Sequence, residues 1–189
     1  MMNLHNVRSA IYDQFLGSSA GAAHFFLPAN ADAYAAYYTS MYLIQDTGEA
    51  IMAHMARDFS KDPLSAYLEF WGVTQEIVIQ QDAIWQIYQA VVGNAPTIKQ
   101  ESNWRQIRER RNLCAGHPAK RDYGVTSPQR TFMGRGFGNY NHIQYELWDS
   151  STNQRTHPVF DLRMMIQAYD AEASDVLKAV LSTMKTKWP

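Results

Sequence analysis

The chain has a single cysteine, Cys114, among its 189 residues. One cysteine cannot form an internal disulfide or supply the thiolates of a cysteine-based metal site. No run approaches the ~18 consecutive apolar residues of a membrane-spanning helix, so we expect no contact with a membrane. The N-terminal stretch lacks the uninterrupted apolar core of a signal peptide. These absences lead us to expect a soluble, cytoplasmic protein.

The chain also has almost no net charge. Its formal charge is −1, which argues against bulk attraction to nucleic acid. Locally the balance differs, because residues 105–135 contain only two acidic residues and eight of the seventeen basic ones, namely Arg105, Arg108, Arg110, Arg111, Lys120, Arg121, Arg130 and Arg135. A basic patch of this kind predicts an anion-binding surface, and the alternative is a solvated helix face followed by a charged loop.

Hydrophobic residues make up 46% of the chain and charged residues 19%, a composition that excludes a disordered protein. The length suits one domain with a sizeable core. No internal repeat or linker divides the sequence, so we expect residues 1–189 to form a single domain.

Apolar residues at helical spacing predict most of the secondary structure. We expect helices over 3–16, 30–59, 64–92, from about Ser102 to Pro118, and 160–185. Asp62-Pro63 is a helix start signal. Gly48 lies within an apolar stripe, which predicts the close approach of another helix. The third helix has so many apolar residues, Leu64, Leu68 and Trp71 among them, that we expect it to be buried over much of its surface.

The helical pattern has two breaks. Residues 24–28 read as a connector with an apolar plug, and 119–139 as a surface loop with hairpin glycines. Residues 143–148 alternate apolar with polar, which is typical of a strand, and 155–159 can return beside it after a turn. The predicted fold is mainly α, a bundle of four or five helices, with a small antiparallel β-hairpin inserted at about 130–159, before the last helix.

Polar chemistry is concentrated in the fourth predicted helix, in the stretch WRQIRERRNLCAGHP from Trp104 to Pro118. Trp104, Ile107, Arg111 and Cys114 share one helical face, which points Arg111 at the bundle interior or at an interface. A guanidinium there is costly unless it is paired or hydrogen-bonded. His117 follows at the glycine that ends the helix.

Arginine beside histidine suits phosphodiester chemistry. A guanidinium can hold phosphate oxygens bidentately and stabilise the charge of a transition state. An imidazole can take a proton from a 2′-hydroxyl or give one to a leaving oxygen. No metal or other cofactor is needed if the 2′-hydroxyl attacks its own phosphate.

The stretch from Arg111 to His117, RNLCAGH, resembles the R-x(4–6)-H motif of HEPN domains, in the form where a polar residue follows the arginine. The resemblance implies a helical bundle, commonly dimeric, in which the motifs of two subunits meet to form the site of a metal-independent ribonuclease. Other HEPN domains serve in binding or assembly.

The resemblance gives each residue an expected role. Arg111 would bind the scissile phosphate, Asn112 would orient the phosphate or the histidine, and His117 would be the acid-base group. The expected RNA-binding residues are Arg105, Arg108, Arg110, Lys120 and Arg121. The first hypothesis is thus a homodimeric endoribonuclease, as a toxin or defence component with an antitoxin or other protein partner. The alternative is an inert module that binds an anionic ligand, RNA or protein.

Several interpretations remain open at this point. The R-x(4–6)-H pattern also fits Arg110 to His117 and Arg135 to His142, although Arg135 lies in predicted loop. Arg111 could instead form an ion pair with Glu49 or Asp46 inside the bundle. His117 could instead cap the C-terminus of its helix. The scattered histidines, which leave a three-histidine metal site open, are His24, His54, His142 and His157.

Overall fold

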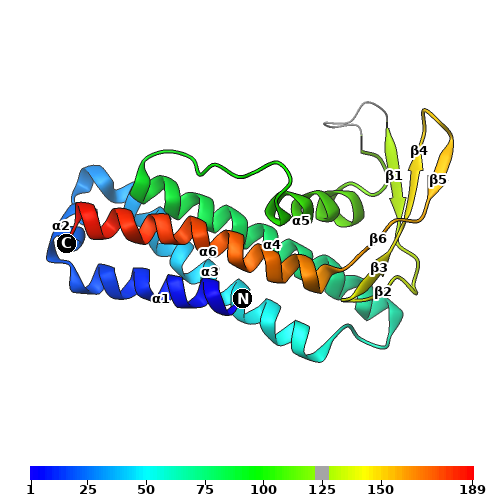
Figure 1. The fold of residues 1–189 in the computed structure, drawn as a ribbon, viewed down its shortest axis with the longest axis horizontal. Coiled ribbons are helices and arrows are strands. Elements are labelled where there is room, and N and C mark those ends of the chain that lie inside the picture. Colours follow the sequence, from blue (N-terminus) through cyan, green and yellow to red (C-terminus); the bar gives the residue numbers. More distant parts are fainter. Residues whose placement is uncertain (122–127) are drawn as a thin grey trace.

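Four long helices pack side by side in the computed structural model, which describes residues 1–121 and 128–189 (Figure 1). They are α1 (Met2–Gly17), α3 (Ala31–Arg57), α4 (Pro63–Val92) and α6 (Leu162–Lys187). The α3 and α4 helices form a hairpin, and α6 packs against both α1 and α4. The prediction of a mainly helical bundle is confirmed, with each long helix within about two residues of its expected range.

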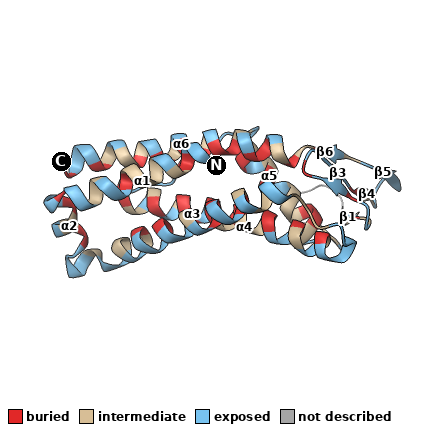
Figure 2. Cartoon of the chain, turned by 90° about the horizontal axis from the view of Figure 1, so that it is seen from below, coloured by how far each residue is buried: buried red, intermediate tan, exposed pale blue. Residues whose placement is uncertain are grey.

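The buried face of α4 differs from the one that the sequence predicted. Asp62 caps the helix as expected, its carboxylate accepting a hydrogen bond from Ser65 N at 2.7 Å. However, Leu64, Leu68 and Trp71 are exposed, and the buried residues of this part of α4 are Ala66, Phe70, Val73 and Thr74. Figure 2 shows buried and exposed residues side by side along α4. Because this helix carries apolar residues on several faces, periodicity alone could not show which face would be covered.

Gly48 confirms the predicted close approach of two helices. A Cβ placed on Gly48 would lie 3.4 Å from Gln80 Nε2 on α4. That amide crosses between the helices and donates to Ile44 O at 3.3 Å and to Thr47 Oγ1 at 3.0 Å. The glycine therefore leaves room for a buried polar contact between α3 and α4.

Residues 18–30, predicted in part as a connector, are mostly helical. They form α2 (Ser19–Phe25) and the 3₁₀ turn η1 (Pro28–Asn30). Ser18 Oγ caps α2 by accepting from Gly21 N at 2.9 Å. Phe25 is buried and supplies the apolar plug, whereas Phe26 and Leu27 face solvent. Residues 26–27 do connect two helical segments, but α2 itself was not predicted, because a capped two-turn helix is too short to show a period.

The helix α5 (Asn103–Arg111) packs against both α4 and α6. Ser102 caps it as predicted, and Glu172 of α6 accepts hydrogen bonds from Asn103 N at 2.9 Å and Trp104 N at 2.8 Å. Trp104 and Ile107 are buried beneath it. These contacts fix the helix that carries most of the predicted site.

In the described residues, six short strands form two antiparallel sheets where one hairpin was predicted. One sheet has the order β1-β4-β5 and the other β2-β3-β6. The strands are β1 (Gln129–Phe132), β2 (Gly138–Asn139), β3 (His142–Gln144), β4 (Glu146–Asp149), β5 (Gln154–Thr156) and β6 (Val159–Phe160). The predicted hairpin is the β4–β5 pair. The chain changes sheets at Tyr145, and an alternating pattern cannot reveal a change of partner.

The predicted loop over 119–139 contains β1 and β2, so part of that prediction was wrong; residues 122–127 of it lie outside the described part of the chain. Both sheets sit at one end of the bundle, where α3 ends and α4 and α6 begin (Figure 1). No helix in the described ranges has the length and apolarity needed to cross a membrane.

Candidate functional site

The predicted site is a turn of π-helix, η2 (Asn112–Gly116), which continues α5. Its closing hydrogen bond runs from His117 N to Asn112 O at 2.8 Å. Strand β1 fastens the turn, since Thr131 Oγ1 donates to Leu113 O and Thr131 N donates to Pro118 O at 2.9 Å. Turns of π-helix are rare and occur often at functional sites. The sequence predicted a helix here but not its wider winding.

The Arg111 guanidinium is held by two side-chain amides. Its Nε and Nη2 donate to Gln75 Oε1 at 3.0 and 2.6 Å, and its Nη1 donates to Asn112 Oδ1 at 2.9 Å. A Cβ on Gly116 would lie only 2.9 Å from Arg111 Nη1. The glycine thus lets the turn fold over the guanidinium, a role that goes beyond ending the helix.

Arg111 is half-buried, and within residues 1–121 and 128–189 it forms no ion pair. Its expected alternative partners, Glu49 and Asp46, make no contact with it there. Three of its five N–H donors are used, which leaves two. A half-buried cation held by neutral amides keeps its full charge and its capacity to bind an anion.

His117 lies at the end of the same turn and is exposed. Its backbone closes the turn, but its side chain makes no hydrogen bond or ion pair with any described residue. His117 thus occupies the C-cap position of the turn, as the alternative expected, but it caps through its backbone and not through its side chain. Asn112 links the predicted residues, because its side chain binds Arg111 and its carbonyl binds His117.

The other predicted cations are placed differently. Arg110 Nη1 donates to Tyr145 Oη at 2.7 Å, and its guanidinium lies 5.7 Å from the centroid of the Phe160 ring. Burial raises the pKa of Tyr145, although Arg110 opposes the shift. Arg110 thus connects α5 to Tyr145 and Phe160 of the sheet region. No contact joins it to His117 among the described residues, which disfavours the Arg110 to His117 pattern.

The remaining basic residues are spread along and beyond α5. Arg108 forms an ion pair with Asp82 at 2.7 Å, and Arg121 forms one with Glu109 at 3.4 Å. Arg105 Nε donates to Ile98 O at 3.3 Å. Lys120 is exposed, and so are Arg135 and His142 of the alternative pattern. The structure thus brings together Arg111, Asn112 and His117, with Arg105 and Arg108 along the α4 side of the same helix.

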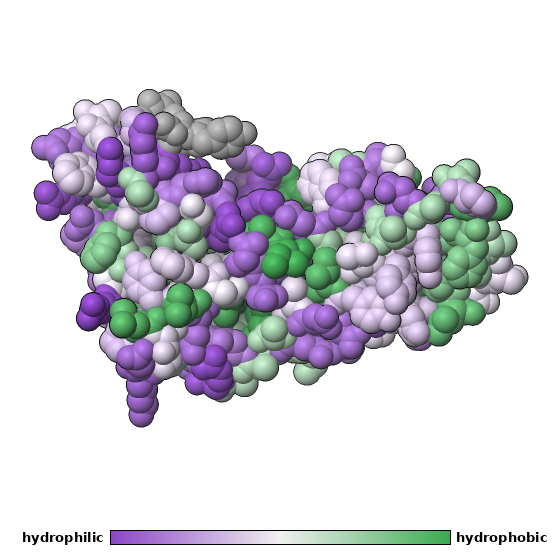
Figure 3. Space-filling view, turned by 180° about the vertical axis from the view of Figure 1, so that it is seen from behind, coloured by the Kyte–Doolittle hydropathy of each residue, from purple (hydrophilic) through white to green (hydrophobic). Residues whose placement is uncertain are grey.

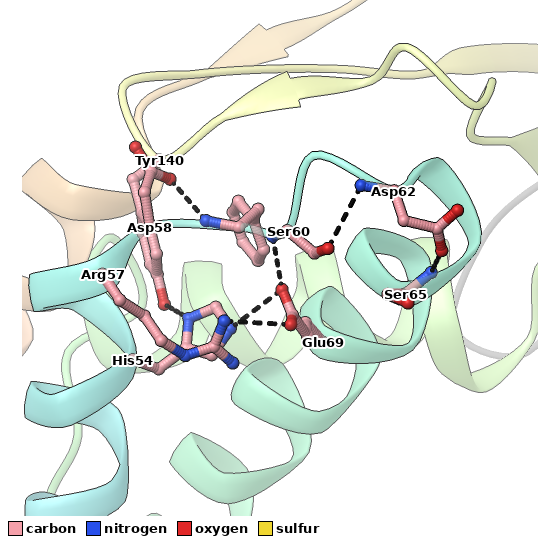
Figure 4. A network of polar contacts seen from close by, with 9 residues as sticks. His54, Arg57, Asp58, Ser60, Asp62, Ser65, Glu69 and Tyr140 are labelled. Carbon is pink, nitrogen blue, oxygen red and sulfur yellow. Dashed lines mark hydrogen bonds and ion pairs between the residues drawn. The ribbon is translucent and has the colours of Figure 1, made fainter.

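A second polar cluster was not predicted from the sequence (Figure 4). Tyr140 Oη lies 2.6 Å from His54 Nδ1, and His54 Nε2 lies 3.3 Å from Glu69 Oε2. The Glu69 carboxylate also forms an ion pair with Arg57 Nη1 at 3.0 Å and accepts a hydrogen bond from Ser60 N at 2.7 Å. These residues come from the end of α3, the α3–α4 connection, the start of α4 and the β2–β3 turn, and no local spacing could have predicted that they meet.

The second cluster is buried around Tyr140 and open to solvent at Arg57, whose side chain is 55% exposed. Tyr140 is fully buried, and the Phe59 ring stacks on it with centroids 4.5 Å apart. Burial lowers the pKa of His54, and the nearby Arg57 cation lowers it further. A neutral His54 accepts the phenol hydrogen at Nδ1, and its Nε2 faces Glu69 without a hydrogen bond of good geometry. This arrangement joins the sheets to the bundle and occupies most of its polar groups with one another.

No group of three potential metal ligands occurs in the described part of the chain, so the scattered histidines do not converge there. Three open cavities of about 450 to 530 Å³ flank α4. Neither Arg111 nor His117 lines any of them. The Cys114 thiol is buried, which raises its pKa to about 12 and makes it unreactive.

Comparisons of the chain with protein-family models, with curated proteins and with solved structures found no match. The functional argument therefore depends on the geometry of the site.

Proposed function

We propose that the protein is a metal-independent endoribonuclease of HEPN type, with its site at Arg111, Asn112 and His117. The observation that carries the proposal is the Arg111 guanidinium, which is fixed by two neutral amides, is paired with no described carboxylate and lies in the turn that ends at the exposed His117. A cation fixed in this way is preorganised to stabilise charge on a phosphate.

The reaction follows from these groups. The 2′-oxygen of the substrate attacks the adjacent phosphorus, and His117 accepts the hydroxyl proton. The bond from phosphorus to the 5′-oxygen breaks, and that oxygen takes up a proton. The products are a 2′,3′-cyclic phosphate and a 5′-hydroxyl end. Arg111 neutralises the charge that gathers on the non-bridging oxygens during the attack.

A homodimer is part of the proposal, because one histidine serves either as base or as acid in a single step. Leu64, Leu68 and Trp71 are exposed on α4, one to three turns before Gln75 and on the same face. An exposed apolar stripe of this kind favours contact with another protein surface. A second subunit on this stripe would bring its own His117 towards the Arg111 of the first.

The test is RNA cleavage in EDTA by the wild type and by His117→Ala, with analysis of the product ends. We expect the wild type to leave cyclic phosphates and the variant to be slower by about 10²-fold or more. The matched control is His142→Ala, an exposed histidine of the alternative pattern, which should cleave like the wild type. Equal cleavage by the wild type and His117→Ala would point to a contaminating nuclease and refute the assignment.

The second candidate is an inert module that binds an anionic ligand. It is favoured because Arg111 and His117 line none of the three cavities that flank α4. Binding of RNA without cleavage, lost in Arg111→Gln, would support it. A role as a toxin or defence component, with an antitoxin partner, requires the active form and predicts that expression of the wild type, but not of His117→Ala, arrests growth.

A further inference from the structure

A cavity of about 520 Å³ opens between α4 and α5, on the same side of α5 as Arg111. Trp85 on α4 and Arg105 and Arg108 on α5 line it, with Asp82 and Gln86 at its edge. Trp104, which is buried, and Ile98 form its apolar floor. The cavity therefore combines a half-exposed indole, two guanidinium groups, two amides including Gln81, and the Asp82 carboxylate, which is paired with Arg108.

The cavity and the proposed catalytic turn both lie on the side of α5 that faces α4, and we call this side the groove. Arg111 contacts Gln75, and Arg108 contacts Asp82. These contacts follow opposite orders along the two helices, so α5 runs antiparallel to α4. The ten residues from Gln75 to Trp85 span about 15 Å of helix. Arg105, Arg108 and Arg111, spaced three apart, thus form a row of cations that leads from the turn to Trp85.

The charges in this groove favour a polyanion. Of the three arginines, only Arg108 has a carboxylate partner among the described residues, so the row keeps an excess of positive charge. The neighbouring cavity, on the far side of Ile98 and Trp104, is lined instead by Glu101, Glu172 and Asp175, with Lys99 as its cation. A phosphate chain would be attracted along the arginine row and repelled by the acidic residues of the neighbouring cavity.

We propose that the Trp85 cavity binds a base of single-stranded RNA, away from the phosphate that is cut at Arg111. The base stacks on the Trp85 indole, and Gln86 and Arg108 lie within the cavity to bond its edge. Arg105 binds a backbone phosphate. The inference rests on the proposed function for the identity of the strand, but the binding of the base requires no cleavage. Stacking of bases on aromatic side chains beside arginines is the general mode of single-strand recognition.

The test measures affinity with the full-length wild-type chain and a fluorescent 2′-O-methyl oligonucleotide, which has no free 2′-hydroxyl and cannot be cut. Trp85→Leu keeps apolar bulk but removes the stacking surface, and we expect it to weaken binding about tenfold or more. Trp85→Phe keeps a ring and should bind more tightly than the leucine variant. The matched control is Tyr42→Leu, an exposed aromatic of α3 outside the groove, which should bind like the wild type.

Two charge variants test the arginine row. Arg105→Gln should reduce the slope of log affinity against log salt by about 0.7, the value for one phosphate contact on a single strand. Asp82→Asn removes the carboxylate of the groove and should tighten binding a few-fold at low salt, since it lies beside the polyanion. Weaker binding in Asp82→Asn would instead indicate a cationic ligand and overturn the proposal.

Equal affinity of Trp85→Leu and the wild type would also overturn it, whether or not the protein cuts RNA. A mononucleotide that competes as well as the oligonucleotide would contradict the row of phosphate contacts. If the wild type binds the oligonucleotide through Trp85 but cuts no RNA, the proposed nuclease fails and the base-binding cavity stands.

Discussion

Two polar clusters lie at the sheet end of the bundle, and similar residue types have different roles in them. Around His54, the imidazole has Glu69 on one side and Tyr140 on the other, and the Phe59 ring covers Tyr140. Around Arg111, the guanidinium is held only by amides, and His117 faces solvent. The first cluster satisfies its own charges, and the second leaves charge and donors for a ligand.

The comparison teaches that convergence of polar side chains is not by itself a sign of catalysis. The charged and hydrogen-bonding groups of a structural clamp complete one another. A binding site keeps unsatisfied capacity and access to solvent. On this criterion the described residues favour the Arg111 turn.

The largest expected effect comes from Gly116→Ala. The new Cβ would lie 2.9 Å from Arg111 Nη1 and displace the guanidinium, while His117 and Arg111 both remain in the chain. We expect RNA cleavage to fall by about 10²-fold, the cost of misplacing one stabilising group in the transition state. Single-turnover cleavage rates in EDTA measure it. Alanine at the open Gly134 is the control, and an unchanged rate in Gly116→Ala would remove Arg111 from the mechanism.

Tyr140→Phe should have the next largest effect, on stability instead of activity. The variant leaves His54 Nδ1 buried without its donor, which costs about 1–3 kcal/mol of unfolding free energy. Urea unfolding measures the loss, and Tyr42→Phe on the exposed face of α3 serves as the control. RNA cleavage by the folded variant should match the wild type. A loss of cleavage without a loss of stability would assign chemistry to the clamp.

The pH dependence of stability should follow His54. Its pKa is lowered in the folded state, so the unfolded chain, with a histidine pKa of about 6.5, binds the proton more readily. The stability that this histidine contributes is present above about pH 6.5 and is lost as the pH falls through the lowered folded pKa. We expect the unfolding free energy to decrease between pH 7.5 and 5.5 by less than about 1.4 kcal/mol per unit.

The variant His54→Asn isolates this contribution from that of the other five histidines. Its unfolding free energy should change less than that of the wild type between the same two pH values. An equal pH dependence in both proteins would show that His54 keeps the same proton affinity after folding.

The smallest expected effect is that of His117→Ala on stability. The side chain is exposed and has no described partner, so the unfolding free energy should stay within about 0.5 kcal/mol of the wild type. The same urea titration measures it. A loss above 1 kcal/mol would revive the interpretation of His117 as a helix cap.

Local patterns predicted much of the fold. The Asp62 and Ser102 caps were correct, and Gly48 correctly indicated the approach of α4. For the site, the sequence placed Arg111 and His117 on one segment, and the structure links them through Asn112. Sequence spacing could not reveal Gln75, because that residue lies 36 positions away on another helix.

The sequence by itself determined what depends on neighbours along the chain, namely the long helices, their caps, the strand alternation and the RNLCAGH segment. Only the tertiary structure decided what depends on neighbours in space. In the folded chain, Arg111 is bound by two amides and not by a carboxylate. Arg110 donates a hydrogen bond to Tyr145 beside the sheets, and His54 forms one with Tyr140. The reason is that a side chain's free charge and exposure depend on the elements packed against it, and residues distant in sequence supply them.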